Sequence, residues 1–341
     1  MHIHYFSGEP WEEEYVRAKL PEEQLTFHKE PLSAYPELTD EEATVLCVFI
    51  EARISEDILK RFPNLKLIAT RSTGFDHIDL VAAQARGITV VNVPSYGENT
   101  VAEFTFALLL ALTRRVIDAD ERVRENGVFS PNGLRGFDLL GKTLGVVGTG
   151  HIGAHVIRMS KGFGMKVVAF DAYPNAELAQ KLDFSYAPLK EVLATSDIVT
   201  LHVPYNEQTH HLINRENIGG FKKGAYLINT SRGAVVETQA LVEALEQGVL
   251  AGAGLDVLEE EGELSEEAAL LTTPHPNEEK LRIALENHYL ISHPRVIVTP
   301  HVAFNTTEAV RRILNTTIEN IVGFGTGATK NVVPLATPSA H

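Results

Sequence analysis

The chain has 341 residues, an ordinary globular composition and a formal net charge of −15. This length allows two domains with sizeable cores, and the negative charge argues against nucleic acids and anionic membranes as partners. The sequence shows no signal peptide and no apolar run long enough to span a bilayer, and the single cysteine, Cys47, excludes an internal disulfide and favours a reducing cytoplasm.

The first 140 residues alternate apolar segments with helical ones. The expected strands are Ile3–Phe6, Val45–Ile50, Lys66–Thr70 and Thr89–Asn92. Helices are expected between them, for example Ser55–Phe62 with Ser55 as its N-cap. Strands that alternate with helices indicate a parallel sheet. A long helical pattern, Glu98–Arg124, follows; it is long enough to cross into a second domain, and its apolar face suits a partner subunit in a homodimer.

A glycine-rich turn, Gly148–Gly153, occupies the middle of the chain and fits G-x-G-x-x-G. An apolar strand is expected before it at Thr143–Val147, and a helix after it at Ile152–Phe163. A second strand, Lys166–Phe170, ends at Asp171, which stands 18 residues beyond the last glycine. A βαβ unit with these features is typical of dinucleotide-binding domains.

Each part of this unit has a physical purpose. Gly148 permits a tight turn, Gly150 permits the close approach of a pyrophosphate, and Gly153 permits close packing of helix on strand. The pyrophosphate would lie on free N–H groups at the helix N-terminus. Asp171 would accept the ribose hydroxyls and repel a 2′-phosphate, so the unit predicts NAD rather than NADP as cofactor.

The strand and helix alternation then resumes. Further strands are expected at Asp197–Val203, Ala225–Asn229, Leu250–Asp256 and Val296–Thr299. Pro188 suits the first turn of a helix and Gly248 suits the end of one. Residues 259–294 read as an acidic insertion with no strand pattern, and Thr307–Phe324 reads as a final helix.

These elements predict an α/β fold with two doubly wound parallel-sheet domains, of Rossmann and flavodoxin-like type, and an active site in the cleft between them. The expected substrate-binding domain is discontinuous, comprising residues 1–99 plus 303–341, because the final helix would pack back on the first domain. The expected NAD-binding domain comprises residues 100–302.

Several other sites are rejected. Gly136–Thr143 fits the P-loop pattern, but it runs directly into an expected strand, whereas a P-loop is followed by a helix. The sequence has no H-E-x-x-H motif and no cysteine cluster, so no metal site is expected. It has no G-x-S-x-G motif, which weighs against a serine hydrolase.

The catalytic candidates follow later strands, where ligands bind in open α/β sheets. Arg232 could hold a substrate carboxylate, although an isolated arginine is more often a surface residue. His301 could donate a proton at neutral pH, although most histidines are structural. The acidic segment Asp256–Glu261 reads as a solvated loop, or as the source of a carboxylate that favours the charged imidazole. Together Arg232, Glu261 and His301 would suit hydride transfer to a ketone.

With these residues in view, the chain resembles the D-isomer-specific 2-hydroxyacid dehydrogenases over nearly its whole length. The blocks that carry the resemblance are the glycine turn, Arg71–Asp79, Asn92–Tyr96, Leu201–Pro204, Asn229–Gly233, Gly254–Val257 and Thr299–His301. The resemblance implies that Arg232, Glu261 and His301 are the catalytic residues. Glu259 and Glu260, beside Glu261, leave the choice of glutamate open.

The resemblance also implies the ligand contacts. The implied NAD contacts are Gly148, Gly150, His151, Ile152, Gly153, Asp171, Val203, Pro204, Thr209, Thr230, Ser231, Asp256 and Ala303. The implied substrate contacts are Phe49, Thr73, Gly74, Tyr96 and Phe304, with backbone N–H groups near Thr73 and Gly74 on the carboxylate.

Within the family, the chain is most similar to the D-lactate dehydrogenases. They carry alanine and an aromatic residue after the histidine, as Ala303 and Phe304 do here, and a tyrosine where Tyr96 stands. We therefore expect reversible reduction of pyruvate to D-lactate. The alternatives are a dehydrogenase for glyoxylate, hydroxypyruvate or longer 2-keto acids, and a corepressor that senses NAD. Glu261 argues against formate, because formate dehydrogenases carry glutamine there.

Overall fold

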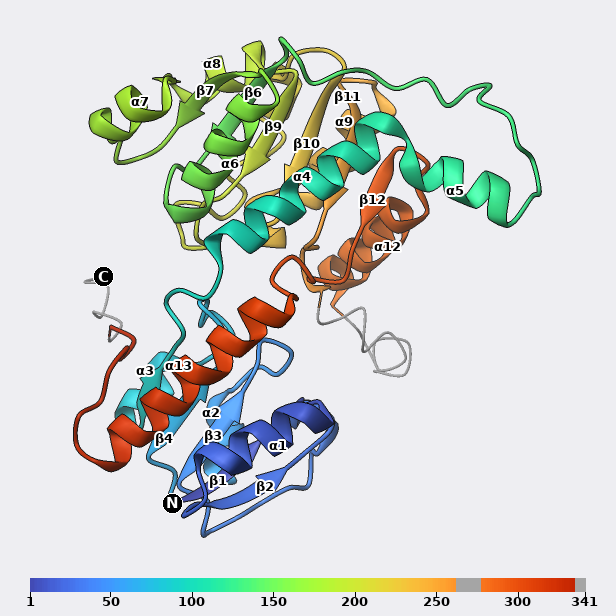
Figure 1. Cartoon of the computed structure of the whole chain (residues 1–341). Coiled ribbons are helices and arrows are strands. Elements are labelled where there is room, and N and C mark those ends of the chain that lie inside the picture. Colours follow the sequence, from blue (N-terminus) through green and yellow to red (C-terminus); the bar gives the residue numbers. More distant parts are fainter. Residues whose placement is uncertain (262–276, 335–341) are drawn as a thin grey trace. The chain divides into compact units, whose positions relative to one another are not determined.

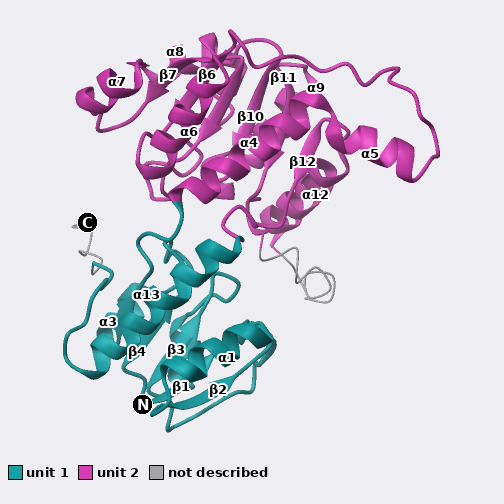
Figure 2. Cartoon of the chain, viewed as in Figure 1, with its two compact units in different colours: residues 1–97, 306–341 teal, residues 98–305 magenta. Residues whose placement is uncertain are grey.

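The computed structural model describes residues 1–261 and 277–334 of the chain (Figure 1). The chain divides into two compact units (Figure 2). Unit 1 comprises Met1–Gly97 and Thr306–His341, and unit 2 comprises Glu98–Asn305. Each unit is built around its own parallel sheet, as the sequence predicts.

Unit 1 has a sheet whose described strands run in the order β2-β1-β3-β4-β5. This is the flavodoxin-like order of a doubly wound fold. Its strands are β1 (His2–Tyr5), β2 (Gln24–Phe27), β3 (Val45–Val48), β4 (Leu67–Thr70) and β5 (Thr89–Val91). Its helices are α1 (Pro10–Lys19), η1 (Leu32–Ala34), α2 (Glu56–Lys60), α3 (Leu80–Ala85) and α13 (Thr307–Gly325).

Alternate side chains of β1 enter two different cores. Ile3 and Tyr5 pack with residues of α1 and α13 on one face of the sheet. Phe6, one residue past the strand, packs with residues of η1, α2 and α3 on the other face, and His4 lies on that face because side chains alternate along a strand. The His28 ring stacks on Phe6 at 4.4 Å between ring centroids. Burial lowers the pKa of His4, and the hydrogen bond to Asp40 opposes that shift; burial lowers the pKa of His28 to about 4, so the His28 ring is neutral near pH 7.

A buried ion pair joins α1 to the sheet of unit 1. The Arg71 guanidinium, just past β4, donates to Glu12 Oε2 at 3.0 Å and to the Tyr5 hydroxyl at 2.9 Å. It also donates to the Phe6 carbonyl at 2.6 Å and lies 5.5 Å from the Phe49 ring centroid. Burial raises the pKa of Glu12, and the Arg71 charge opposes that shift. Arg71 therefore fixes the strand end from which the Ser72–Gly74 loop departs.

Unit 2 has a sheet whose described strands run in the order β12-β11-β10-β9-β6-β7-β8. The chain reverses direction across the sheet between β6 and β9, which is the switch point where nucleotides bind in Rossmann folds. The strands are β6 (Thr143–Val147), β7 (Lys166–Phe170), β8 (Ser185–Tyr186), β9 (Ile198–Leu201), β10 (Ala225–Asn229), β11 (Leu250–Leu255) and β12 (Val296–Val298). The helices are α4 (Glu98–Arg114), α5 (Val116–Arg124), α6 (His151–Gly162), α7 (Ala176–Leu182), α8 (Leu189–Thr195), η2 (Ile218–Gly220), η3 (Gly233–Val235), α9 (Thr238–Glu246) and α12 (Glu278–Ser292).

Two cores lie on the two faces of this sheet. One contains residues of α4 and α6 packed on β6, β7 and β9. The other contains residues of α8 and α9, together with Leu290 of α12, packed mainly on β9, β10 and β11. Because helices cover both faces, the strands are nearly continuous apolar runs, which explains why the sequence pattern identifies them well.

The sequence prediction of one helix over Glu98–Arg124 is wrong. The helix breaks at Arg115, whose φ is 52°, and continues as α5. The Thr113 carbonyl accepts a hydrogen bond from the backbone N–H of Phe137 at 3.2 Å. A Cβ on Gly136 would lie 2.2 Å from the same carbonyl oxygen, so glycine is required where the returning chain packs on the end of α4.

The elements expected from the sequence also include no strand at β2 or β8 and no helix at α12. β2 and β8 are short edge strands with 4 and 2 residues. Helix α12 lies within the acidic segment 259–294, whose residues 262–276 lie outside the described residues. Residues 136–142 lead directly into β6, which begins at Thr143, as the rejection of a P-loop requires.

Candidate active site

The glycine-rich turn joins β6 to α6 and is open where a ligand would lie. Gly148 has φ +93°, and a Cβ there would lie 2.6 Å from the His202 carbonyl oxygen. A Cβ on Gly153 would lie 2.0 Å from the Gly148 carbonyl oxygen, whereas a Cβ on Gly150 meets no atom within 4 Å. Gly150 is also the N-cap of α6 and makes no side-chain cap hydrogen bond. The turn therefore leaves space and backbone donors for a pyrophosphate at Gly150.

Asp171 lies at the end of β7 and contacts the same turn through Thr149. Its Oδ2 accepts from the backbone N–H of Thr149 at 2.7 Å and from the Thr149 hydroxyl at 2.9 Å. Its Oδ1 accepts from the backbone N–H of Tyr173 at 2.9 Å. The carboxylate is thus held beside the glycine turn, at the place where an adenosine ribose lies in dinucleotide-binding folds.

The next cofactor candidates follow β9, the strand beside β6. Val203 and Pro204 come directly after His202, and the Thr209 hydroxyl donates to the Pro204 carbonyl at 2.6 Å. The His202 ring contacts the Thr200 hydroxyl at 2.9 Å, and burial lowers the pKa of His202 to about 3. His202 is a neutral support for this edge; it lies in the Leu201–Pro204 sequence block, but no role at the site is assigned to it from the sequence.

The candidates after β10 are tied together by short hydrogen bonds. The Ser231 hydroxyl donates to Asn229 Oδ1 at 2.7 Å. The Thr230 and Thr105 hydroxyls lie 3.0 Å apart, which links the loop to α4. Asn229 Nδ2 donates to the Arg232 carbonyl at 2.9 Å. These bonds position Arg232 at the carboxyl end of the sheet.

Arg232 lies in a loop that packs tightly on the loop after β11. The next residue, Gly233, packs directly on the backbone of Leu258 and Glu259. A Cβ at Gly233 would lie 2.0 Å from the Leu258 carbonyl carbon and 2.3 Å from the Glu259 nitrogen. No other residue type fits this space. Gly233 therefore brings the loop of Arg232 against the segment that leads to Glu261.

Asp256 fastens the segment that carries His301. The Asp256 carboxylate accepts from the Thr299 hydroxyl at 2.5 Å and from the backbone N–H groups of Val302 and Ala303 at 3.0 and 2.8 Å. Burial raises its pKa, and these hydrogen bonds oppose that shift. Asp256 and Ala303 are therefore joined by a hydrogen bond of their own, in addition to any contact that they make with a cofactor.

His301 pairs with Glu261. Its Nδ1 lies 2.6 Å from Glu261 Oε1, and the two side chains are 22% and 40% exposed. The His301 backbone has φ 52°, and its N–H donates to the Asp256 carbonyl at 2.8 Å. The histidine is therefore oriented by a carboxylate and by the backbone, and both groups remain accessible.

The structure separates the three neighbouring glutamates. Glu259 is buried, and its carboxylate binds His211 Nε2 at 2.6 Å and the Thr238 hydroxyl at 2.7 Å. Glu260 is exposed and has φ 52°. Glu261 is the one that contacts His301. The geometry thus favours Glu261 as the carboxylate partner and gives Glu259 a structural role.

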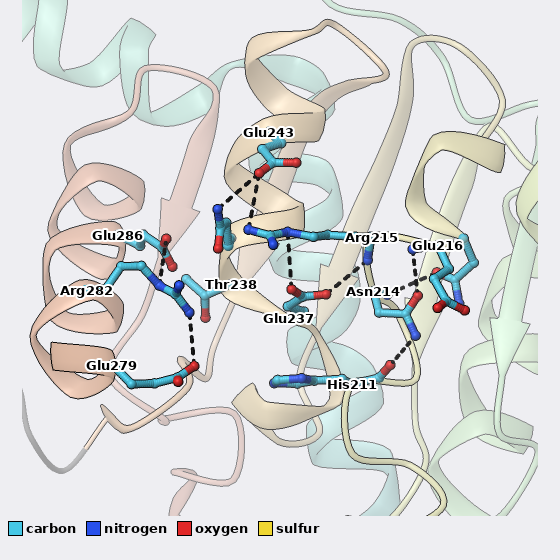
Figure 3. Close-up of polar contacts among 12 residues, drawn as sticks. His211, Asn214, Arg215, Glu216, Glu237, Thr238, Glu243, Glu279, Arg282 and Glu286 are labelled. Carbon is cyan, nitrogen blue, oxygen red and sulfur yellow. Dashed lines mark hydrogen bonds and ion pairs between the residues drawn. The ribbon is translucent and has the colours of Figure 1, made fainter. Parts of the chain in front are cut away.

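Figure 3 shows the ion pairs of Arg215 and Arg282 together with His211 and Thr238, the two residues whose side chains contact Glu259. Arg215 lies between two acids, with 3.3 Å from its Nε to Glu237 and 3.3 Å from its Nη2 to Glu243. On α12, Arg282 pairs with acids one turn away on either side. Exposed pairs of this kind contribute little individually. Arg215 nevertheless attaches the turn after His211 to the start of α9, where Thr238 holds Glu259.

Four of the five substrate candidates, Phe49, Thr73, Gly74 and Tyr96, lie in unit 1, and Phe304 lies in unit 2. The Thr73 hydroxyl donates to the Val93 carbonyl, and Asn92 Nδ2 donates to the Thr73 carbonyl, both at 2.8 Å. The Tyr96 carbonyl accepts from the Arg312 guanidinium of α13. The loops after β4 and β5 are thus joined to each other and to the last helix.

Comparison with known proteins identifies the family of the chain. The family model described as "D-isomer specific 2-hydroxyacid dehydrogenase, NAD binding domain" matches residues 106–303. The chain is also 41% identical over 335 residues to 2-hydroxyacid dehydrogenase homolog 1 of Schizosaccharomyces pombe, which covers 95% of this chain and 96% of that protein. The chain belongs to the D-isomer specific 2-hydroxyacid dehydrogenases.

Members of this family with different named substrates are similar to the chain. The D-lactate dehydrogenase of Aquifex aeolicus, solved with NAD and lactic acid, has a TM-score of 0.84 and 36% identity and covers 96% of each chain. The pyruvate reductase of Chlamydomonas reinhardtii has a TM-score of 0.83 and 37% identity and covers 99% of this chain and 98% of its own. A glyoxylate reductase of Korarchaeum cryptofilum is 39% identical over 277 residues, which are 80% of this chain and 77% of that protein.

As a D-2-hydroxyacid dehydrogenase, the protein uses NAD. The described residues fit this cofactor, because the space at Gly150 and the uncapped start of α6 suit its pyrophosphate. None of the helices in the described part of the chain combines the length and the apolar character that crossing a membrane requires.

Proposed function

We propose that this D-2-hydroxyacid dehydrogenase is a D-lactate dehydrogenase that reduces pyruvate reversibly to D-lactate. The observation that carries the catalytic assignment is the 2.6 Å contact between His301 Nδ1 and Glu261 Oε1. In the charged imidazole both ring nitrogens carry a proton, so a carboxylate can accept from Nδ1–H while Nε2–H serves as the proton donor. Such a donor is what a ketone oxygen needs when the carbonyl carbon is reduced.

The other proposed roles follow from charge and position. When bound, NADH supplies the hydride for the carbonyl carbon. The charged His301 imidazole gives its proton to the carbonyl oxygen, and Glu261 stabilises that charged form; in the reverse reaction the neutral imidazole takes the proton back from the hydroxyl. Arg232 holds the substrate carboxylate through paired N–H donors. Thr73 and Gly74 in unit 1 are proposed carboxylate ligands through their backbone N–H groups.

Pyruvate as substrate is supported by side chains and by relatives. Phe49, Tyr96 and Phe304 are the aromatic residues proposed to contact the substrate, and an apolar surface at Phe49 suits a methyl group. The solved structures named D-lactate dehydrogenase and pyruvate reductase match nearly the whole chain. The second candidate substrate is glyoxylate, because several similar curated proteins are named glyoxylate reductase.

A substrate panel tests the proposal. Initial rates of NADH oxidation with pyruvate, glyoxylate, hydroxypyruvate and 4-methyl-2-oxopentanoate give kcat/KM for each, and chiral chromatography identifies the lactate enantiomer. We expect pyruvate to have the highest kcat/KM and D-lactate to be the product. A higher kcat/KM for glyoxylate would make the protein a glyoxylate reductase. Absence of turnover with every 2-keto acid would refute the enzyme assignment and favour an NAD-sensing role.

We also propose that the protein is a homodimer. Helix α5 and the segment after it extend away from the sheet of unit 2 (Figure 1) and expose several apolar side chains: Val116, Ile117, Val123, Val128 and Phe129. Phe129 is 94% exposed, and a group of exposed apolar residues indicates a protein interface. Light scattering after size-exclusion chromatography should give twice the mass of one chain, and a monomer at micromolar concentration would contradict the proposal.

The proposed location is the cytoplasm. The single cysteine, Cys47, is buried in β3, and burial raises the pKa of its thiol to about 12. A cysteine used in this way is a small apolar core residue, as expected in a reducing compartment. Fluorescence microscopy of a tagged chain would contradict this location if the signal lay in a membrane-bound compartment.

A further inference from the structure

Two histidines of β1 and one aspartate converge in unit 1, outside the residues proposed for catalysis. His2 and His4 are two residues apart on the strand, so both side chains leave the same face of the sheet. Asp40 comes from the segment between η1 and β3. His4 Nε2 lies 2.8 Å and His2 Nδ1 lies 3.4 Å from Asp40 Oδ2, and the three atoms all lie within 4.8 Å of one another.

The cluster is largely shielded from solvent. The side chains of His4, His2 and Asp40 are 3%, 10% and 20% exposed. His2 Nδ1 is buried and has no hydrogen-bond partner among the residues that the structure describes. A buried polar atom without a partner is costly and rare in native proteins. His2 Nδ1 makes no hydrogen bond to a described residue, and its 3.4 Å contact with Asp40 Oδ2 leaves the nitrogen available to bind a metal ion between the two groups.

The remaining polar atoms of the three side chains are held by neighbouring groups. His2 Nε2 contacts the Thr26 hydroxyl at 3.1 Å, and His4 Nδ1 contacts His28 Nε2 at 2.9 Å. Asp40 Oδ1 accepts from a backbone N–H at 2.7 Å. Histidines that bind metals use one ring nitrogen for the metal and hydrogen-bond the other to a protein group. The outer contacts here have that arrangement.

We propose that His2 Nδ1, His4 Nε2 and Asp40 Oδ2 bind a divalent transition-metal ion, with Zn²⁺ the best match. Two imidazoles and one carboxylate are common zinc ligands, and tetrahedral coordination places ligand atoms about 3.3 Å apart. The 3.4 Å separation of His2 from Asp40 already has this spacing. His4 and Asp40 must separate by about 0.5 Å to admit the ion, and a water molecule would complete the coordination.

The position of the cluster assigns the ion a structural role. His2 begins β1, and Asp40 lies shortly before β3, so the cluster lies toward the amino ends of the strands. Thr73 and Gly74 follow the carboxyl end of β4, so they lie at the opposite end of the parallel strands. The ion would fasten the segment between β2 and β3 to β1. We therefore expect it to raise stability without entering the dehydrogenase reaction.

Metal binding by the whole protein tests the proposal directly. The full chain is freed of metal with EDTA and titrated with ZnCl₂ by calorimetry and with CoCl₂ by visible absorption. We expect one site with a dissociation constant of about 1 μM or tighter, tetrahedral Co²⁺ bands, and a Tm raised by a few degrees with excess Zn²⁺. Absence of Zn²⁺ binding by the wild type would refute the proposal.

Variants assign the site to these residues. Asp40→Asn and His2→Gln, both near the edge of the cluster, should each weaken Zn²⁺ binding by about 100-fold or more. His288→Asn, an exposed histidine on α12, is the matched control and should bind as the wild type does. Zn²⁺ binding that survives in both cluster variants would place the site elsewhere and overturn the proposal. Because a variant can misfold, nitrogen-15 spectra of wild-type histidine rings provide a second test: the shifts of His2 Nδ1 and His4 Nε2 must change with Zn²⁺.

Discussion

His301 Nδ1 lies 2.6 Å from Glu261 Oε1, although the two residues are 40 positions apart in the chain. The histidine follows β12 and the glutamate follows β11, and these strands are neighbours in the sheet. Asp256 holds the histidine loop in place through its carboxylate. The parallel sheet therefore creates the pair by placing two strand ends side by side, and the ring is left with Nε2 as its proton donor.

Replacement of His301 by asparagine should remove the proton donor and leave the fold intact. We expect kcat for pyruvate reduction to fall by about 10²–10⁴-fold, which is the usual contribution of a general acid. The affinity for NADH should change little, because the glycine turn and Asp171 belong to other loops. Steady-state rates and a fluorescence titration of NADH measure the two effects. Loss of NADH binding would contradict the proton-donor role.

The three adjacent glutamates should give three different results. Glu261→Gln removes the charge beside His301, and we expect kcat to fall by about tenfold or more with unchanged stability. Glu259→Gln disturbs the buried contacts with His211 and Thr238, and it should lower the free energy of unfolding by about 1–3 kcal/mol. Glu260→Gln is the matched control, because Glu260 is exposed. Rates and urea denaturation separate these outcomes, and a larger kcat loss in Glu260→Gln than in Glu261→Gln would refute the assignment.

Most strands of unit 2 could be predicted closely from the sequence, because helices cover both faces of their sheet. β7 and β10 have the predicted bounds, Lys166–Phe170 and Ala225–Asn229. β8 was missed because an edge strand of 2 residues carries too little apolar pattern to recognise. The apolar pattern of the sequence is therefore sufficient to predict a strand where several buried residues follow one another along the chain.

Features that depend on distant partners could not be predicted. The break at Arg115 arises because residues 136–137 pack on the end of α4. Arg71 is paired with Glu12, 59 positions away. The motif did identify Glu261 as a candidate, but the choice among the three glutamates needed the contact with His301. Sequence pattern names the residue types at the site, whereas packing decides which of them meet.

The two glycines of the cofactor turn should separate ligand binding from folding. A Cβ on Gly150 meets no atom within 4 Å, whereas a Cβ on Gly153 would lie 2.0 Å from the Gly148 carbonyl oxygen. Gly150→Ala should therefore keep wild-type stability and weaken NADH binding, by about tenfold or more, because the methyl group occupies the pyrophosphate position. Gly153→Ala should lower the free energy of unfolding by about 1–3 kcal/mol through steric strain. Unchanged NADH affinity in Gly150→Ala would place the pyrophosphate elsewhere.

The stability of the protein should fall in acid partly because of His202. Burial lowers the pKa of His202 from 6.5 to about 3, so the folded state keeps the ring neutral where the unfolded chain protonates it. Since the unfolded state then binds more protons, the free energy of unfolding decreases as the pH falls from about 6.5 to about 3. At about pH 4.5 this effect amounts to about 2–3 kcal/mol relative to about pH 7. In His202→Gln, which keeps a polar group for the Thr200 hydroxyl, urea denaturation at these two pH values should show an acid loss smaller by that amount. An equal loss in both proteins would show that the folded state accommodates a charged His202.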